Sequence, residues 1–307
     1  DADEYGDGGR GEGKGGEEAY RPSGPHPLQG VPQYEDLPVP EPLAASGGGA
    51  DNAGGPANDT ELLNLVGEYL VRCIMSKQWS LREAAIIKMK LMLPDLCTDP
   101  GAGSILQPLA NVLRGGIEDK IAQVFLSTLG LLDAACKEFE AARLNTHMVN
   151  KQLEPTATVL VLKLGENQPR VREAAIDSLL NLAHCEAVGL DFVVRSVTKK
   201  LPKKQTGNRI WRPLATRLQL LKDLLLQFGV TGATSTNTIM TFINSNEATS
   251  HTFQEVRDAA RELTVALHQI VGADVEPYLE PLRLKQREEY DQAFAEAAAG
   301  GGGGGGG

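Results

Sequence analysis

The chain has 307 residues, of which 41% are hydrophobic and 23% are charged, and its formal net charge is −10. It contains no run of 18 apolar residues and no signal-peptide pattern, which argues against a membrane-spanning segment and against secretion. The four cysteines form no Cys-x-x-Cys pair, which argues against a metal site. Free thiols without an export signal indicate a cytosolic protein. Because the first residue is Asp1, we expect a fragment of a longer protein.

Composition divides the chain into three parts. Residues 1–57 are rich in Gly, Pro and Glu and hold 11 acidic but only 3 basic residues. They carry too few large apolar side chains to offset chain entropy, so a disordered tail is predicted. Residues 58–298 are nearly neutral and long enough to bury the core of one domain. Residues 299–307 are predicted to be a flexible poly-Gly tail.

Apolar residues at helical spacing, separated by short polar links, predict an all-α fold of about five to six helical hairpins. The cysteines Cys73, Cys136 and Cys185 lie in these helical stretches and are expected to be ordinary buried thiols. The predicted pairs are 58–75 with 79–93, 104–113 with 117–139 (joined by 114–116), 145–164 with 169–185, 188–200 with 211–228, and 235–244 with 253–271, followed by a last helix over 277–298.

One motif recurs at the start of three predicted helices: an apolar residue, an arginine, an acid and two alanines. Its arginines are Arg82, Arg172 and Arg257, which lie 90 and 85 residues apart. These intervals are twice the period of about 40–47 residues that is typical of HEAT repeats. The sequence therefore predicts a HEAT-repeat α-solenoid, a class that mostly binds proteins through loops on one edge. We expect the three arginines to be structural, each bonding to the turn of the neighbouring repeat.

The turns inside the hairpins are expected to form a row along that edge. Trp79 stands at the first turn, outside any apolar stripe, and Trp and Arg are the commonest residues at binding hot spots. Two interpretations stay open for Trp79: an exposed anchor for a partner, or a ring folded back as a local staple. The row comprises Lys77, Gln78 and Trp79; Glu118, Asp119 and Lys120; Gln168, Pro169 and Arg170; Asn208, Arg209, Trp211 and Arg212; and Thr252, Phe253 and Gln254.

Nothing in the sequence indicates an enzyme or a cofactor. There is no phosphate-binding loop, no nucleophile elbow and no His-Glu-x-x-His motif. The acids that follow the repeated arginines, Glu83, Glu173 and Asp258, show no pairing suited to acid–base catalysis.

Residues 195–222 contain nine basic residues and no acid, which favours an anionic partner or a solvated loop. Nucleic-acid binding is the less favoured alternative, because base stacking needs interleaved aromatic residues and this stretch offers only Trp211.

Three features together resemble a TOG domain, the HEAT-repeat paddle that binds αβ-tubulin in microtubule regulators. They are Trp79 in the first turn, Arg170 ahead of Val-Arg-Glu-Ala-Ala, and the five-hairpin frame. More narrowly, residues 76–84, 117–125 and 284–294 are similar to the TOG domains of the centrosomal 104-kDa protein family, found at ciliary tips. The resemblance covers residues 58–298.

The resemblance implies that the Trp79 turn engages β-tubulin and that later, basic turns engage α-tubulin at microtubule ends. It implies a protein of the cytoplasm and cytoskeleton, at the cilium or flagellum tip and the centriole or basal body. Further ciliary-tip or centriolar partners would bind segments outside this chain. A HEAT adaptor for a different protein remains the alternative. The implied tubulin-binding residues are Lys77, Trp79, Lys120, Ile121, Arg170, Arg209, Arg212 and Gln254.

Two departures from the family pattern stand out. The fifth turn offers Phe253 and Gln254 where a lysine or arginine is usual. The second turn is expected to contain Gly115 and Gly116, which would loosen its geometry. Both departures predict altered affinity on the α-tubulin side.

Overall fold

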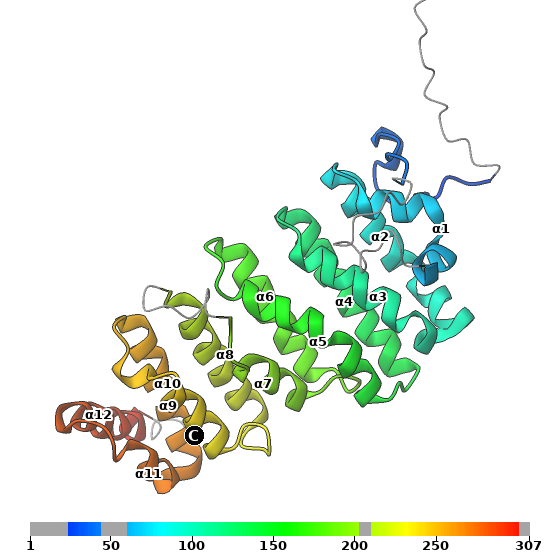
Figure 1. The fold of residues 1–307 in the computed structure, drawn as a ribbon. Helices are drawn as coiled ribbons and strands as arrows, with labels where there is room; N and C mark the ends of the chain where they lie inside the picture. The colour runs from blue at the N-terminus through cyan, green and yellow to red at the C-terminus, as the bar shows by residue number, and fades with distance from the viewer. Residues whose placement is uncertain (1–23, 44–59, 203–209, 301–307) are drawn as a thin grey trace, which may run out of the picture.

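A computed structural model describes residues 24–43, 60–202 and 210–300. Within these ranges the chain is all-α, without a strand, which confirms the predicted fold class (Figure 1). Its α-helices are α1 (Thr60–Met75), α2 (Trp79–Leu96), α3 (Ala102–Glu118), α4 (Ala122–Ala141), α5 (Thr146–Lys163), α6 (Pro169–His184), α7 (Leu190–Thr198), α8 (Arg212–Phe228), α9 (Thr236–Ser245), α10 (Gln254–Val271), α11 (Glu276–Leu279) and α12 (Leu284–Gly300).

The helices form two layers that advance together along the array (Figure 1). One layer is the succession α2, α4, α6, α8 and α10, each packed on the next, and α1, α3, α5 and α7 pack in the same way in the other layer. A continuous apolar core lies between them and extends from Leu62 to Phe294. Cys73, Cys136 and Cys185 are buried free thiols, as expected. None of the described helices is both long and apolar enough to cross a lipid bilayer.

Local chemistry explains where several helices begin. The side chain of Asn145 accepts hydrogen bonds from the N–H groups of His147 and Met148 and caps α5. Pro169 occupies the first turn of α6, where its missing N–H is not needed. The predicted end of the second helix at residue 93 is wrong, because α2 continues through Pro94 to Leu96.

The second hairpin differs from the prediction. Gly115 and Gly116 lie inside α3, and the turn begins at Asp119 instead. At Gly116 the helices α3 and α4 approach so closely that a Cβ would lie 2.9 Å from Cγ2 of Thr128 and closer still to its Oγ1. Gly116 is therefore a packing glycine, and the expected loosening of the turn by this pair is wrong.

The predicted N-terminal tail is wrong for residues 24–43. Leu28 and Val31 are 0% and 4% exposed and pack with Tyr69, Leu70 and Leu81. The low content of apolar residues does not produce disorder here, because a short segment needs few of them when it packs on an apolar face that other helices already provide. Residues 1–23 and 44–57 lie outside the described residues, as do 301–307 of the predicted poly-Gly tail, whereas α12 runs to Gly300.

The two glycines of α3 allow a matched test. We expect Gly116→Ala to lower the free energy of unfolding by about 1–3 kcal/mol, because the new methyl group overpacks the α3–α4 contact. Gly115 has open space around it, so Gly115→Ala should instead stabilise α3 by about 0.5–1 kcal/mol through helix propensity. Urea unfolding followed by circular dichroism measures both variants. Equal effects of the two substitutions would contradict the close contact.

Candidate protein-binding edge

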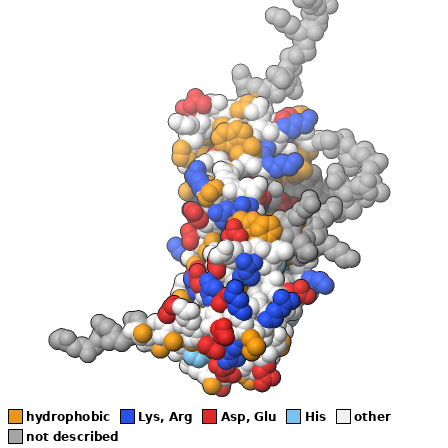
Figure 2. Space-filling view, turned by 90° about the vertical axis from the view of Figure 1, so that its left-hand side faces the viewer, with side chains coloured by type: hydrophobic (Ala, Val, Ile, Leu, Met, Phe, Trp, Pro, Cys, Tyr) orange, Lys and Arg blue, Asp and Glu red, His pale blue; other side chains and the backbone are white. Residues whose placement is uncertain are grey.

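The turns that join the two helices of each hairpin lie at the starts of α2, α4, α6, α8 and α10, along one edge of the array. We call this edge the turn row. It lies on the left-hand side in Figure 1, and Figure 2 looks onto that side, where hydrophobic, Lys or Arg, and Asp or Glu side chains are interspersed. The structure places all the predicted binding residues on this row except Arg209, which lies outside the described residues.

Two apolar side chains are exposed at the first two turns. Trp79 is the first residue of α2, and 46% of its surface is exposed, although its neighbour Leu81 is fully buried. Ile121, the residue before α4, is 39% exposed. A large indole left in water at a helix start favours the anchor interpretation of Trp79 over the local staple.

Three cations flank these apolar residues. Lys77, Lys120 and Arg170 are exposed at the first, second and third turns. In the part of the chain that the structure describes, no hydrogen bond or ion pair engages their charged ends. The charge of Glu41 attracts Lys77, whereas Lys120 and Arg170 extend from the second and third turns. Exposed cations at successive turns can pair with carboxylates on the surface of an acidic partner.

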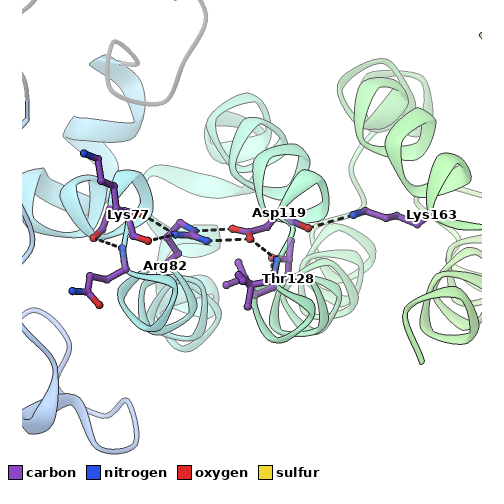
Figure 3. Close-up of polar contacts among 9 residues, drawn as sticks. Lys77, Arg82, Asp119, Thr128 and Lys163 are labelled. Atoms are coloured by element: carbon purple, nitrogen blue, oxygen red, sulfur yellow. Dashed lines mark hydrogen bonds and ion pairs between the residues drawn. The ribbon is translucent and has the colours of Figure 1, made fainter. Parts of the chain in front are cut away.

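Arg82 joins the first turn to the second (Figure 3). Its Nε lies 2.7 Å from Oδ2 of Asp119 and its Nη2 lies 3.1 Å from Oδ1, so the pair is bidentate. Its Nη1 donates to the carbonyl oxygens of Ser76 and Lys77 in its own turn. Little of either side chain is exposed: 21% for Arg82 and 10% for Asp119. A bidentate pair of this kind is directional and strong.

Asp119 is also the link to the third hairpin. Its carboxylate accepts the N–H of Ile121 at 2.9 Å, and its carbonyl oxygen accepts Nζ of Lys163 at 3.3 Å (Figure 3). Burial alone would raise the pKa of Asp119, but the hydrogen bonds from Arg82 and Ile121 hold the pKa below its ordinary value. The carboxylate is therefore charged at neutral pH and fixes the second turn.

The other repeated arginines differ from the expectation. Nη1 of Arg172 donates to the carbonyl oxygen of Glu166, and Nη1 of Arg257 donates to those of His251 and Thr252. These carbonyls belong to the turn that precedes each arginine in its own hairpin. Among the described residues, which leave out 203–209 of the fourth turn, Arg82 alone of the three also reaches the turn of a neighbouring repeat. The shared feature of the motif is thus closure of its own turn.

Different contacts join the later turns. Arg212, at the start of α8, donates to Oδ1 of Asn167 in the third turn at 2.6 Å, and its guanidinium lies 4.9 Å from the Trp211 ring centre. The rings of Trp211 and Phe253 lie 6.2 Å apart and connect the fourth and fifth turns. Gln254, the first residue of α10, is exposed beside them. Asp119, Asn167 and Phe253 were not recognised as links from sequence.

The basic stretch 195–222 does not form one patch in the described part of the chain. Arg217 is 2% exposed, and its guanidinium donates to the carbonyl oxygens of Val197 and Lys199. Burial lowers the pKa of Arg217 to about 10. Lys199 pairs with Glu154 and Lys222 with Glu262. Because these basic side chains already bind groups of the protein, they are less available to neutralise the phosphates of a nucleic acid. Lys203 and Lys204 lie outside the described residues.

Replacing Asp119 tests the link between the turns. Asp119→Asn should lower the free energy of unfolding by about 1.5–3 kcal/mol at neutral pH, because Arg82 loses a charged acceptor. The folded-state pKa of Asp119 is depressed, so its contribution is complete above the ordinary Asp pKa and is lost as pH falls through the lower folded value. The difference between wild type and variant should shrink accordingly in urea unfolding series at decreasing pH.

The half-exposed pair of Asp258 and Arg261, which is more open to water than the pair of Arg82 and Asp119, supplies the control for that series. Asp258→Asn should change stability by less than about 1 kcal/mol at neutral pH, because exposed ion pairs contribute little. If the two variants behaved alike, Asp119 would not be a structural link.

Comparisons with known proteins agree with this architecture. The protein family "Centrosomal protein CEP104, TOG domain" matches residues 58–263. The human centrosomal protein of 104 kDa is 26% identical over 232 residues, which cover 71% of this chain and 24% of the human protein. The chain thus spans about a quarter of that relative's length.

Solved structures share the fold. The TOG domain of human Cep104 superposes with a TM-score of 0.68 at 22% identity, covering 86% of this chain and 99% of that one. A structure from work on TOG–tubulin binding specificity gives a TM-score of 0.62 at 16% identity, covering 75% and 82%. Because the family match covers more than half of the chain, and the fold is that of a TOG-type HEAT-repeat solenoid, the chain belongs to the CEP104 TOG-domain family.

Proposed function

We propose that this chain binds αβ-tubulin through the turn row and thereby contributes to the regulation of microtubule ends. The observation that carries the proposal is the exposed indole of Trp79 on a turn that Arg82 and Asp119 hold in place. Family membership adds support, as does the likeness in fold to TOG domains studied for tubulin binding and for microtubule polymerase activity.

The chemistry of the row fits such a partner. Trp79 and Ile121 supply apolar area at its N-terminal end, and Lys77, Lys120 and Arg170 surround that area with positive charge. An indole that fills a pocket while neighbouring cations pair with carboxylates is a common arrangement at binding hot spots. Because the turns are already linked to one another, little backbone order has to be created on binding, and the main ordering cost falls on the free ends of Lys77, Lys120 and Arg170.

The proposal assigns the ends of the row by resemblance. The Trp79 turn meets β-tubulin, and the later turns with Arg170, Arg212 and Gln254 meet α-tubulin, with Arg209 beside them in the sequence. The role is one of binding, without catalysis or a cofactor. We place it in the cytoskeleton, at centrioles, basal bodies and ciliary tips, where further partners would bind segments outside this chain.

A HEAT adaptor for a different protein is the second candidate. The exposed Trp79 and the unpaired cations would serve any acidic partner with a suitable pocket. Direct binding to purified αβ-tubulin separates the two functions.

Trp79→Ala is the sharpest test of the proposed function. We expect the variant to lose about 2–4 kcal/mol of tubulin-binding free energy, because a hot-spot ring is removed. Its fold should remain intact, since the ring lies outside the core. The measurement is gel filtration of the full chain with soluble αβ-tubulin, followed by titration of labelled tubulin. Leu226→Ala is the matched control, because Leu226 is also apolar and exposed but lies in α8, away from the turns.

Two results would count against tubulin as the partner or Trp79 as its anchor. One is failure of the wild-type chain to bind tubulin at all, which would favour the adaptor. The other is equal affinity of wild type and Trp79→Ala, which would move the binding surface elsewhere.

Charge reversal at the third turn tests whether the cations of the turn row contribute to tubulin binding. Arg170→Glu should weaken tubulin binding about tenfold or more at low salt, because an exposed cation on the row becomes an anion. The difference from wild type should decrease as salt is raised. Lys137→Glu is the control, since Lys137 is an exposed cation on α4 away from the turns. Equal losses in the two variants would show that only net charge matters.

A further inference from the structure

Residues 24–43 lie outside the stretch that the TOG family matches, yet they pack on the first hairpin. We call this segment the N-terminal clamp. Leu28 and Val31 insert against α1 and α2. The ring of His26 stacks on Tyr34 with centres 5.0 Å apart and meets the edge of Tyr69 at 5.3 Å. The clamp thus covers part of the first hairpin, which no preceding repeat covers in the described chain.

The C-terminal end of the clamp reaches the base of the first turn. Arg72, in the last turn of α1, donates through Nε to the carbonyl oxygen of Glu41 at 2.9 Å and through Nη2 to that of Pro40. The hydroxyl of Ser76 donates to Oε2 of Glu41 at 2.7 Å. Ser76 is only 5% exposed, and its position between α1 and α2 is therefore defined by these neighbours.

Ser76 passes this contact on to the turn. Its hydroxyl oxygen accepts the N–H of Gln78 at 3.1 Å, and its carbonyl oxygen accepts Nη1 of Arg82. Gln78 is the residue before α2, and its own side chain makes no capping hydrogen bond. The backbone just before Trp79 is therefore held on one side by Arg82 and on the other by Ser76, which Glu41 orients.

We propose that the N-terminal clamp is part of the partner-binding module and that Glu41 is a positioning residue for Trp79. The proposal rests on the proposed tubulin binding. Glu41 acts by fixing the Ser76 hydroxyl so that the Gln78 N–H has an acceptor. Its charge also attracts Lys77, an attraction that both Glu41→Ala and Glu41→Gln remove, so the difference between these two variants isolates the hydrogen bond. A segment outside the hairpins then sets the orientation of the indole and raises affinity for the partner.

A purely structural clamp would behave differently. If the segment only shielded Leu70 and Leu81 from water, the buried pair Leu28 and Val31 would account for its whole effect. Removing the exposed Glu41 carboxylate would then leave both the first turn and the affinity unchanged.

The experiment compares Glu41→Ala with Glu41→Gln in the full chain. Glutamine keeps an oxygen that can accept the Ser76 hydroxyl, whereas alanine does not. We expect Glu41→Ala to speed hydrogen exchange at the Gln78 amide and to weaken tubulin binding, each about three- to tenfold, the size expected for one lost hydrogen bond. Glu41→Gln should keep most of both properties, with thermal unfolding unchanged in the two variants. Glu35→Ala is the control, an exposed acid in the same segment.

The possible results separate this proposal from the proposed function. Wild-type exchange at Gln78 in Glu41→Ala would overturn the positioning role, and so would faster exchange with unchanged affinity. If wild type itself failed to bind tubulin, the proposed function would fall, and the exchange rates alone would decide whether Glu41 orders the turn. Leu28→Asp, which should release the whole clamp, is expected to reproduce the faster exchange at Gln78; normal exchange in that variant would also overturn the proposal.

Discussion

The bidentate pair of Arg82 and Asp119 fixes the spacing between the first two turns, and the geometry of the whole edge follows from that spacing. A binding surface built from separate turns is useful only if neighbouring turns keep a constant separation. The pair provides this in a place where both side chains are largely removed from water. Lys163 then contacts the carbonyl of Asp119, Arg212 contacts Asn167, and Trp211 packs near Phe253. Each adjacent pair of turns is thus joined by at least one side-chain contact.

The repeated arginine shows how one sequence motif serves two purposes. In each of the three hairpins that carry it, the guanidinium closes its own turn by donating to carbonyl oxygens that no helix satisfies. In the first hairpin the next turn also presents a carboxylate, that of Asp119, within reach of the guanidinium. The motif therefore encodes turn geometry in every copy, while contact between repeats depends on what the neighbouring turn offers.

The sequence predicted the helical hairpins and the turn row well, because helical periodicity and capping are local properties that a short window reveals. It failed where distant residues decide. The sequence predicted a turn at Gly115 and Gly116, but both lie inside α3, and Gly116 allows α3 to approach Thr128 of α4 closely. Composition predicted a disordered tail for residues 24–43, but α1 and α2 provide an apolar face on which Leu28 and Val31 pack. The partnership of Asp119 with Arg82 spans 37 residues, and no local signal identifies it.

The fifth turn shows why a missing basic residue does not leave that end of the row without charge. Phe253 stands where the resemblance to TOG domains led us to expect a cation, and its ring lies 6.2 Å from that of Trp211. The guanidinium of Arg212 lies over the ring of Trp211 and also donates a hydrogen bond to Asn167. A cation placed over an indole gains from the ring's electron density and loses little conformational freedom when it meets an anion. The aromatic pair and Asn167 therefore keep the Arg212 guanidinium in a defined orientation on the fourth turn, next to the fifth.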